Sequence, residues 1–171
     1  MSIVIIAIGL PGSGKTTLLR PFVEKYGLSY ISRDLIYNEM FDLDSNHREV
    51  IGEVWEETNR RLRTEIQNKN HVLRDSTFAD PEERRDTIRD VRAWGAHRVV
   101  GVFVDVDPEV AKDRNQKRER VVGDEVIDWR YLQLCHYPPG LEDGFDAFYT
   151  SDQVEEFERI ELIPLKDLAA N

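Results

Sequence analysis

The 171-residue sequence predicts an α/β fold in which a central, parallel, five-stranded sheet carries helices on both faces. Two observations support this prediction. Apolar, β-rich runs alternate with helical patterns along the chain, and a glycine-rich turn joins the first apolar run to the first helical pattern. No repeat, linker or low-complexity tract interrupts the sequence, so residues 1–171 are expected to form one domain.

The first strand is expected over residues 2–9, where the chain is continuously apolar. The stretch GLPGSGKTT follows at residues 9–17. A helix is expected next, because an apolar face recurs at Leu18, Leu19, Phe22 and Val23. The short run LSYIS, residues 28–32, predicts the second strand.

A long charged helix is expected over residues 46–69, with Val50, Val54, Trp55, Leu62 and Ile66 as its apolar face. Strands are expected on either side of the following helix, at HVLRDST, residues 71–77, and at RVVGVFVDVD, residues 98–107. Helices should start at Asp80-Pro81 and Asp107-Pro108, since aspartate favours the N-cap and proline the first helical position. Gly95 should end the first of them.

The last elements are a helix over about residues 124–135, the turn YPPG and a strand near residues 146–150. The segment from about residue 160 to 171 is expected to fray.

The spacing of Gly9, Gly14, Lys15 and Thr16 fits the phosphate-binding loop pattern at every fixed position. Glycines leave room for backbone N–H groups to converge on a phosphate at the start of a helix. Lys15 would reach the β- and γ-phosphates of ATP, and the Thr16 hydroxyl would bind Mg²⁺. The alternative, a glycine-rich turn that only links strand and helix, fits the context less well. The expected nucleotide-binding residues are Gly9, Gly12, Ser13, Gly14, Lys15, Thr16 and Thr17.

Composition narrows the functional classes. The formal net charge is −10, from 23 basic and 33 acidic residues, which argues against broad non-specific nucleic-acid binding but leaves room for a local basic groove. The apolar start is too short to span a membrane, so we expect neither a membrane segment nor an export signal. The four histidines are scattered, so no metal cluster is expected. The lone Cys135 suits a reducing cytoplasm.

Two carboxylates follow strand-like runs, where ligands of open α/β sheets bind. Asp34 follows the second strand and is a candidate general base for an acceptor hydroxyl, although Ser32 or Asp34 could instead simply cap the next helix. Asp75 follows the third strand and is a candidate Mg²⁺ or acceptor contact. Asp105 competes for that role, and we prefer Asp75 because two hydroxyl residues follow it.

Basic residues gather in the helix that starts at Pro108. Arg114 and Arg118 are four residues apart, so they share a face on which two guanidinium groups could close over phosphates. We expect a lid over about residues 108–123. The alternative is a solvated charged face, in which Asp113 pairs with these arginines.

Together, GLPGSGKTT, SRD, LRDST and DRNQKR resemble the 5′-hydroxyl polynucleotide kinase branch of the P-loop kinases, and the resemblance covers residues 3 to about 150. It implies a P-loop kinase fold with a helical lid. It implies that Lys15, Asp34 and Arg118 are catalytic, with Asp34 as the base. Arg118 and Arg114 would clamp ATP, and Asp75 would lie near the acceptor. The substrate-binding residues are expected to be Arg33, Asp34, Tyr37, Arg74 and Asp75.

The expected activity is therefore ATP- and Mg²⁺-dependent transfer of phosphate to the 5′-hydroxyl end of RNA or DNA. Two departures count against it: some members of the family carry an arginine where this chain has Tyr37, and the net charge is acidic. A small-molecule kinase that phosphorylates a metabolite, nucleoside or antibiotic hydroxyl is the first alternative. An ATP-binding switch with slow hydrolysis is the second.

Overall fold

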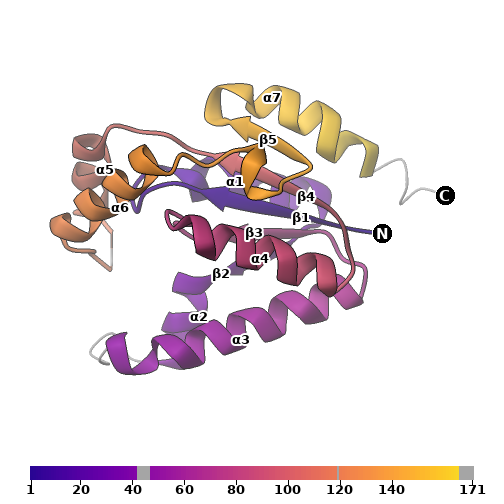
Figure 1. The fold of residues 1–171 in the computed structure, drawn as a ribbon, viewed down its shortest axis with the longest axis horizontal. Coiled ribbons are helices and arrows are strands. Elements are labelled where there is room, and N and C mark those ends of the chain that lie inside the picture. The colour runs from indigo at the N-terminus through magenta and orange to yellow at the C-terminus, as the bar shows by residue number, and fades with distance from the viewer. Residues whose placement is uncertain (42–46, 119, 166–171) are drawn as a thin grey trace.

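The computed structural model describes residues 1–41, 47–118 and 120–165, and its centre is a parallel five-stranded sheet (Figure 1). The strands are β1 (Ser2–Ile8), β2 (Ser29–Ser32), β3 (Val72–Asp75), β4 (Ala96–Phe103) and β5 (Ala147–Thr150). Their order in the sheet is β2-β3-β1-β4-β5, with every pair parallel. The predicted α/β fold and its five parallel strands are confirmed.

The helices cover both faces of the sheet (Figure 1). They are α1 (Lys15–Tyr26), α2 (Arg33–Met40), α3 (His47–Gln67), α4 (Pro81–Ala93), α5 (Pro108–Asn115), α6 (Asp124–His136) and α7 (Val154–Phe157). Core residues of α2, α3, α4 and α6 pack with one set of β1 side chains, including Val4 and Ile6. The alternate β1 residues Ile5 and Ala7 pack with α1 and α7. β1 is therefore apolar on both faces, as a central parallel strand requires.

The register of the sheet aligns the carboxyl ends of three strands. Ala7 pairs with Asp75, and Asp75 pairs with Ser32, so β1, β3 and β2 end at the same edge of the sheet. In Figure 1 the strands run toward the end of the molecule where α5 and α6 lie. The loops that follow β1, β2 and β3 therefore meet at this edge, as the sequence predicts.

Local signals set several boundaries. The carboxylates of Asp80 and Asp107 accept hydrogen bonds from the N–H groups of Glu82 and Glu109, at 2.8 Å each, and so cap α4 and α5. β4 ends at Phe103, four residues before the predicted end at 107. The N–H of Val104 still bonds to the carbonyl of Ile8, but the chain then leaves the sheet to reach the cap of α5.

The C-terminal segment is helical as far as it is described. A π-helical turn covers Glu158–Leu162, and Leu162 and Leu165 are buried against the α1 face of the sheet. The rest of the segment expected to fray, residues 166–171, lies outside the described residues. None of the described helices has the length and apolar composition needed to cross a lipid bilayer.

A buried ion pair ties α4 to the loop before β5. Nε of Arg84 donates to Oδ2 of Asp143 at 2.6 Å, and both side chains are 1% exposed. Arg84 also donates to the carbonyls of Phe78, Ala79 and Tyr137, so its guanidinium joins three segments of chain. Because both charges are desolvated, each depends on its partner.

Replacing Asp143 with alanine should therefore leave the Arg84 charge buried without an ionic partner. We expect the free energy of unfolding to fall by about 3–5 kcal/mol, measured by urea denaturation. The matched control is Asp86→Ala, which removes one of the two carboxylates that pair with the exposed Arg89 and should have little effect. A loss at position 143 no larger than that of the control would contradict the role of the pair.

Candidate active site

The loop between β1 and α1 adopts a backbone that only glycine accepts readily. Gly9, Gly12 and Gly14 have φ values of 147°, 81° and 97°. A Cβ atom on Gly12 would lie 2.2 Å from the carbonyl oxygen of Ala111 in α5, and one on Gly9 would lie 2.5 Å from that of Val104. The loop is thus wedged against the segment that leads from β4 into α5.

Lys15 starts α1 and turns back over this loop. Its ammonium donates to the carbonyls of Gly9 and Leu10 at 2.8 and 2.9 Å. Burial lowers the pKa of Lys15, while the charges of Asp75 and Asp34 oppose that shift. The adjacent Ser13 hydroxyl is buried and has no hydrogen-bond partner in the part of the chain that the structure describes. An unpaired buried hydroxyl beside a lysine and a helix N-terminus suits the phosphates of a nucleotide.

Thr16 and Asp75 lie in contact. The Thr16 hydroxyl donates to Oδ2 of Asp75 at 2.9 Å, and the Tyr30 hydroxyl of β2 donates to the same oxygen at 2.6 Å. Burial and the neighbouring Asp75 charge raise the pKa of Tyr30, so it remains a hydrogen-bond donor near neutral pH. A hydroxyl and a carboxylate side by side are the hard oxygen ligands that Mg²⁺ prefers.

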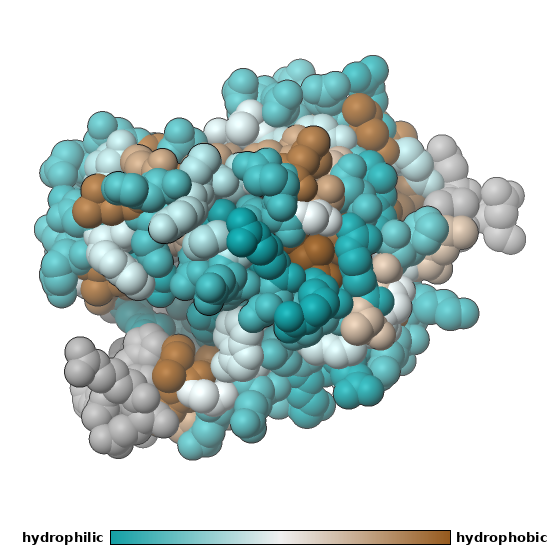
Figure 2. Space-filling view, viewed as in Figure 1, coloured by the Kyte–Doolittle hydropathy of each residue, from teal (hydrophilic) through white to brown (hydrophobic). Residues whose placement is uncertain are grey.

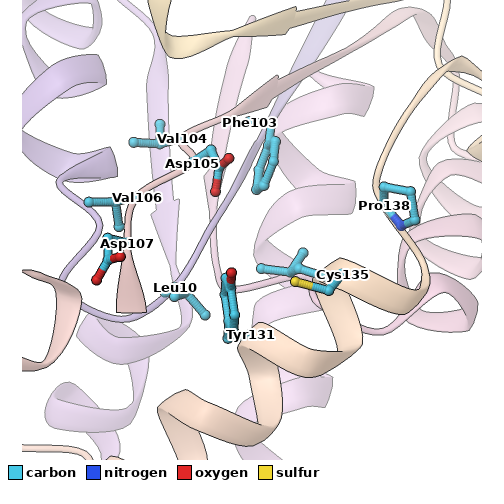
Figure 3. Close-up of a pocket in the computed structure, with 10 residues that line it drawn as sticks. Leu10, Phe103, Val104, Asp105, Val106, Asp107, Tyr131, Cys135 and Pro138 are labelled. Carbon is cyan, nitrogen blue, oxygen red and sulfur yellow. The ribbon is translucent and has the colours of Figure 1, made fainter. Parts of the chain in front are cut away.

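Asp105, the competing carboxylate, lies elsewhere. It lines a cavity of about 470 Å³ between the segment after β4 and α6. Figure 3 shows Phe103 at the end of β4, Asp105 in the segment after β4, and Tyr131 and Cys135 in α6. The cavity lining includes Leu10 of the glycine-rich loop but neither Thr16 nor Asp75. The geometry therefore favours Asp75 as the carboxylate near a bound metal ion.

Asp34 lies in the first turn of α2 and faces the predicted lid. Its carboxylate accepts from Nη2 of Arg118 at 3.3 Å and from Nη1 of Arg120 at 3.5 Å. Ser32 is the N-cap residue of α2, yet its side chain makes no capping bond. Arg114 extends to the carbonyl of Ser13, at 3.3 Å. The arginines after β4 thus touch both the phosphate loop and Asp34.

The other residues that were expected to bind the substrate are largely buried. Tyr37 and Arg74 are 3% and 1% exposed, and the guanidinium of Arg120 lies over the Tyr37 ring at 4.2 Å. Arg33 is partly buried, pairs with Glu83 of α4 and lies over the ring of Trp55 at 4.8 Å. Direct contact of these side chains with an acceptor stays a prediction. Figure 2 shows the surface hollowed on the side where α2 and α3 face α5 and α6.

Three residues at this edge make interactions that no local pattern in the sequence predicts. Tyr30 bonds to Asp75, Arg120 to Asp34, and Arg130 of α6 interacts electrostatically with Glu83 and Arg33. Arg120 stands in the basic run that predicts the lid, but its stacking on Tyr37 depends on the folded lid. Arg130 belongs to no motif.

Solved structures share the fold at low sequence identity. A chain of the Pnkp1/Rnl/Hen1 RNA repair complex matches 79% of this chain with a TM-score of 0.70 and 18% identity. This chain spans 44% of that one, less than half of its length. A protein from Chloroflexus aurantiacus J-10-fl, provisionally described as a kinase, matches with a TM-score of 0.71 and 17% identity, over 92% of this chain and 97% of the other.

A shikimate kinase from Bacteroides thetaiotaomicron matches 99% of both chains with a TM-score of 0.56 and 19% identity. No curated protein matches the sequence significantly. A family model described as an AAA domain matches residues 4–130, well over half of the chain, from β1 through the middle of α6. The chain therefore belongs to this AAA domain family, and it has the P-loop kinase fold.

Proposed function

We propose that this protein transfers the γ-phosphate of ATP to the 5′-hydroxyl end of RNA or DNA in the cytoplasm. One observation carries the proposal: Lys15, Asp34 and Arg118 converge from three separate segments. Arg118 contacts Asp34, and the charges of both act on the buried Lys15 ammonium. A lysine in the phosphate loop, a candidate base and an arginine of the lid at one edge of the sheet are the parts that phosphoryl transfer requires.

The loop residues fit ATP. Backbone N–H groups at the start of α1 and the unpaired Ser13 hydroxyl would bind phosphate oxygens. Lys15, now bonded to the loop's own carbonyls, would exchange them for the β- and γ-phosphates. Arg114 and Arg118 would hold the phosphates from the lid side.

Thr16 and Asp75 fit a Mg²⁺ ion, with Thr16 as a direct ligand and Asp75 beside it. Bound Mg²⁺ would neutralise charge on the β- and γ-phosphate oxygens. Tyr30 would hold Asp75 in position, because its hydroxyl donates to the Asp75 carboxylate and does not itself bind the metal ion.

Asp34 would accept the proton of the 5′-hydroxyl as that oxygen bonds to the γ-phosphorus and the bond to the β-phosphate oxygen breaks. Lys15 and Arg118 would neutralise the charge on the transferring group and the leaving group. Arg118 forms an ion pair with Asp34 at 3.3 Å. Its move to the phosphates would release Asp34 for the acceptor.

The nucleic-acid acceptor is supported by the SRD and DRNQKR segments and by arginines around Asp34. A small-molecule acceptor is favoured instead by the net charge of −10 and by Tyr37 at a position where related kinases carry arginine. A salt titration of acceptor binding separates them. Several phosphate contacts give a steep negative dependence on salt, and a neutral metabolite gives almost none.

Replacing Asp34 with asparagine should remove the base while keeping its shape. We expect kcat for transfer of labelled phosphate from ATP to 5′-hydroxyl oligonucleotides to fall by about 100- to 10,000-fold. ATP affinity should not fall, because Asp34 is not expected to contact the nucleotide and its loss leaves Arg118 free for the phosphates.

The matched control is Asp113→Asn, which changes an exposed lid carboxylate that pairs with Lys117. Oligonucleotides with a 5′-phosphate should accept no label. Full transfer by the Asp34 variant would exclude this residue as the base. Tight ATP binding by the wild-type protein without acceptor-stimulated turnover would support the switch instead.

Replacing Tyr30 with phenylalanine should loosen Asp75. We expect the Mg²⁺ concentration for half-maximal binding of Mg·ATP to rise about tenfold, as is typical when a group that hydrogen-bonds to a metal ligand is removed. ATP binding without Mg²⁺ should stay unchanged. The control is Tyr26→Phe, which removes a hydroxyl of α1 that bonds to Glu158 and not to Asp75. Equal Mg²⁺ dependence in both variants, measured by calorimetry, would contradict this role.

A further inference from the structure

Three arginines from different elements surround one carboxylate beside Asp34. Arg33 of α2 forms an ion pair with Glu83 of α4, and its guanidinium stacks on Trp55 of α3. Glu83 also acts electrostatically on Arg74 of β3 and Arg130 of α6. Chain segments far apart in sequence thus place three positive charges within reach of a single acidic side chain.

The other nearby carboxylates are already engaged. Asp34 bonds to the lid arginines, and Asp75 accepts from Thr16 and Tyr30. Asp80 caps α4 through the N–H of Glu82. The charges of Asp75 and Asp34 act on Arg74, and that of Asp80 acts on Arg130. In the described chain, however, Glu83 alone forms a direct ion pair with the cluster of Arg33, Arg74 and Arg130, so part of the hydrogen-bonding capacity of the cluster is left for a ligand.

These arginines are buried or partly buried. Arg74 is 1% exposed, and the side chain of Arg33 is 20% exposed. Burial lowers the pKa of Arg130, and the positive charge of Arg33 acts in the same direction, while Glu83 and Asp80 oppose the shift. Partly desolvated cations that repel one another favour the binding of an anion.

Arg33 still has hydrogen-bonding capacity. Its Nε is buried and has no partner among residues 1–41, 47–118 and 120–165, while one terminal nitrogen bonds to Glu83. Buried donors are nearly always satisfied in native proteins. An unpaired guanidinium edge beside a second arginine matches the oxygen atoms of a phosphate group.

We propose that Arg33 and Arg130 bind a phosphate group of the acceptor, next to the hydroxyl that Asp34 activates, and that Arg74 supports them by its charge. This inference rests on the proposed function, since it assigns the acceptor side of that site. Arg33 immediately precedes Asp34, whereas the lid residue Arg114 contacts the phosphate loop. In nucleic acid, the phosphate that follows the first nucleoside lies one sugar away from the 5′-hydroxyl.

The same placement explains the absence of an arginine at position 37. Tyr37 is buried and lies under Arg120, so position 37 supplies no positive charge for the phosphate of the acceptor. In this proposal the arginine cluster supplies that positive charge from α2 and α6. The protein would thus distinguish a phosphorylated acceptor from a neutral one despite its acidic surface.

The test compares two acceptors that both carry a 5′-hydroxyl, adenosine 3′-monophosphate and adenosine. The variants are Arg130→Gln and Arg33→Lys, and the control is Arg89→Gln, which changes an exposed arginine of α4. Turnover is measured with saturating Mg·ATP. Binding of adenosine 3′-monophosphate is measured separately by calorimetry on protein saturated with ADP.

We expect each cluster variant to lower kcat/KM for adenosine 3′-monophosphate by about 10- to 100-fold, the range for one charged hydrogen-bonding group. The values for adenosine and the KM for ATP should stay within about twofold of wild type. Equal losses with both acceptors would overturn the proposal, since the cluster would then only support the fold or Asp34. A raised KM for ATP would overturn it by assigning the cluster to the donor.

The binding arm separates this inference from the proposed function. If neither acceptor is phosphorylated but binding of adenosine 3′-monophosphate still depends on Arg130, the transfer proposal fails and the phosphate site stands. If both cluster variants bind it as the wild-type protein does, the phosphate site is excluded, whether or not transfer occurs.

Discussion

The close contact between the phosphate loop and α5 determines where the lid arginines lie. The Cα of Gly12 approaches the carbonyl of Ala111 so closely that no side chain fits between them. This contact fixes the start of the lid relative to the loop. Arg114 can therefore reach the carbonyl of Ser13, and Arg118, just beyond α5, can reach Asp34. The spacing of both proposed substrate sites depends on a glycine that makes no contact with the acceptor.

Local charge at the site differs in sign from the whole chain. The formal net charge is −10, yet Arg33, Arg74, Arg118, Arg120 and Arg130 lie around Asp34 and Glu83. Arg33, Arg74 and Arg130 are buried or partly buried, so their charges act more strongly than charges on the open surface. Net charge therefore bears on solubility and long-range attraction, whereas the proposed choice of acceptor depends on these three arginines.

The sequence predicted the helices and strands that short local patterns specify. The apolar run before GLPGSGKTT and the pairs Asp80-Pro81 and Asp107-Pro108 specify their elements within a few residues, and the alternation of strands and helices predicted the parallel sheet and the edge where ligands bind. The sequence did not predict the order of the strands in the sheet. It did not predict the bond from Tyr30 to Asp75, the Arg84–Asp143 pair or the position of Arg130. Each of these joins segments at least 45 residues apart or faces another element, and only the packed sheet brings them together. β4 was predicted too long because residues 104–107 remain β-like in composition after leaving the ladder.

Pairing between Arg118 and Asp34 links the two halves of the proposed reaction. In the proposed reaction the same guanidinium also binds the phosphates of ATP, and one guanidinium cannot pair fully with both groups at once. With Arg118 on Asp34, the carboxylate is occupied; with Arg118 on the phosphates, the carboxylate can accept the hydrogen bond of the acceptor hydroxyl. One arginine would thereby make the activity of the base depend on a bound donor, without any further moving part.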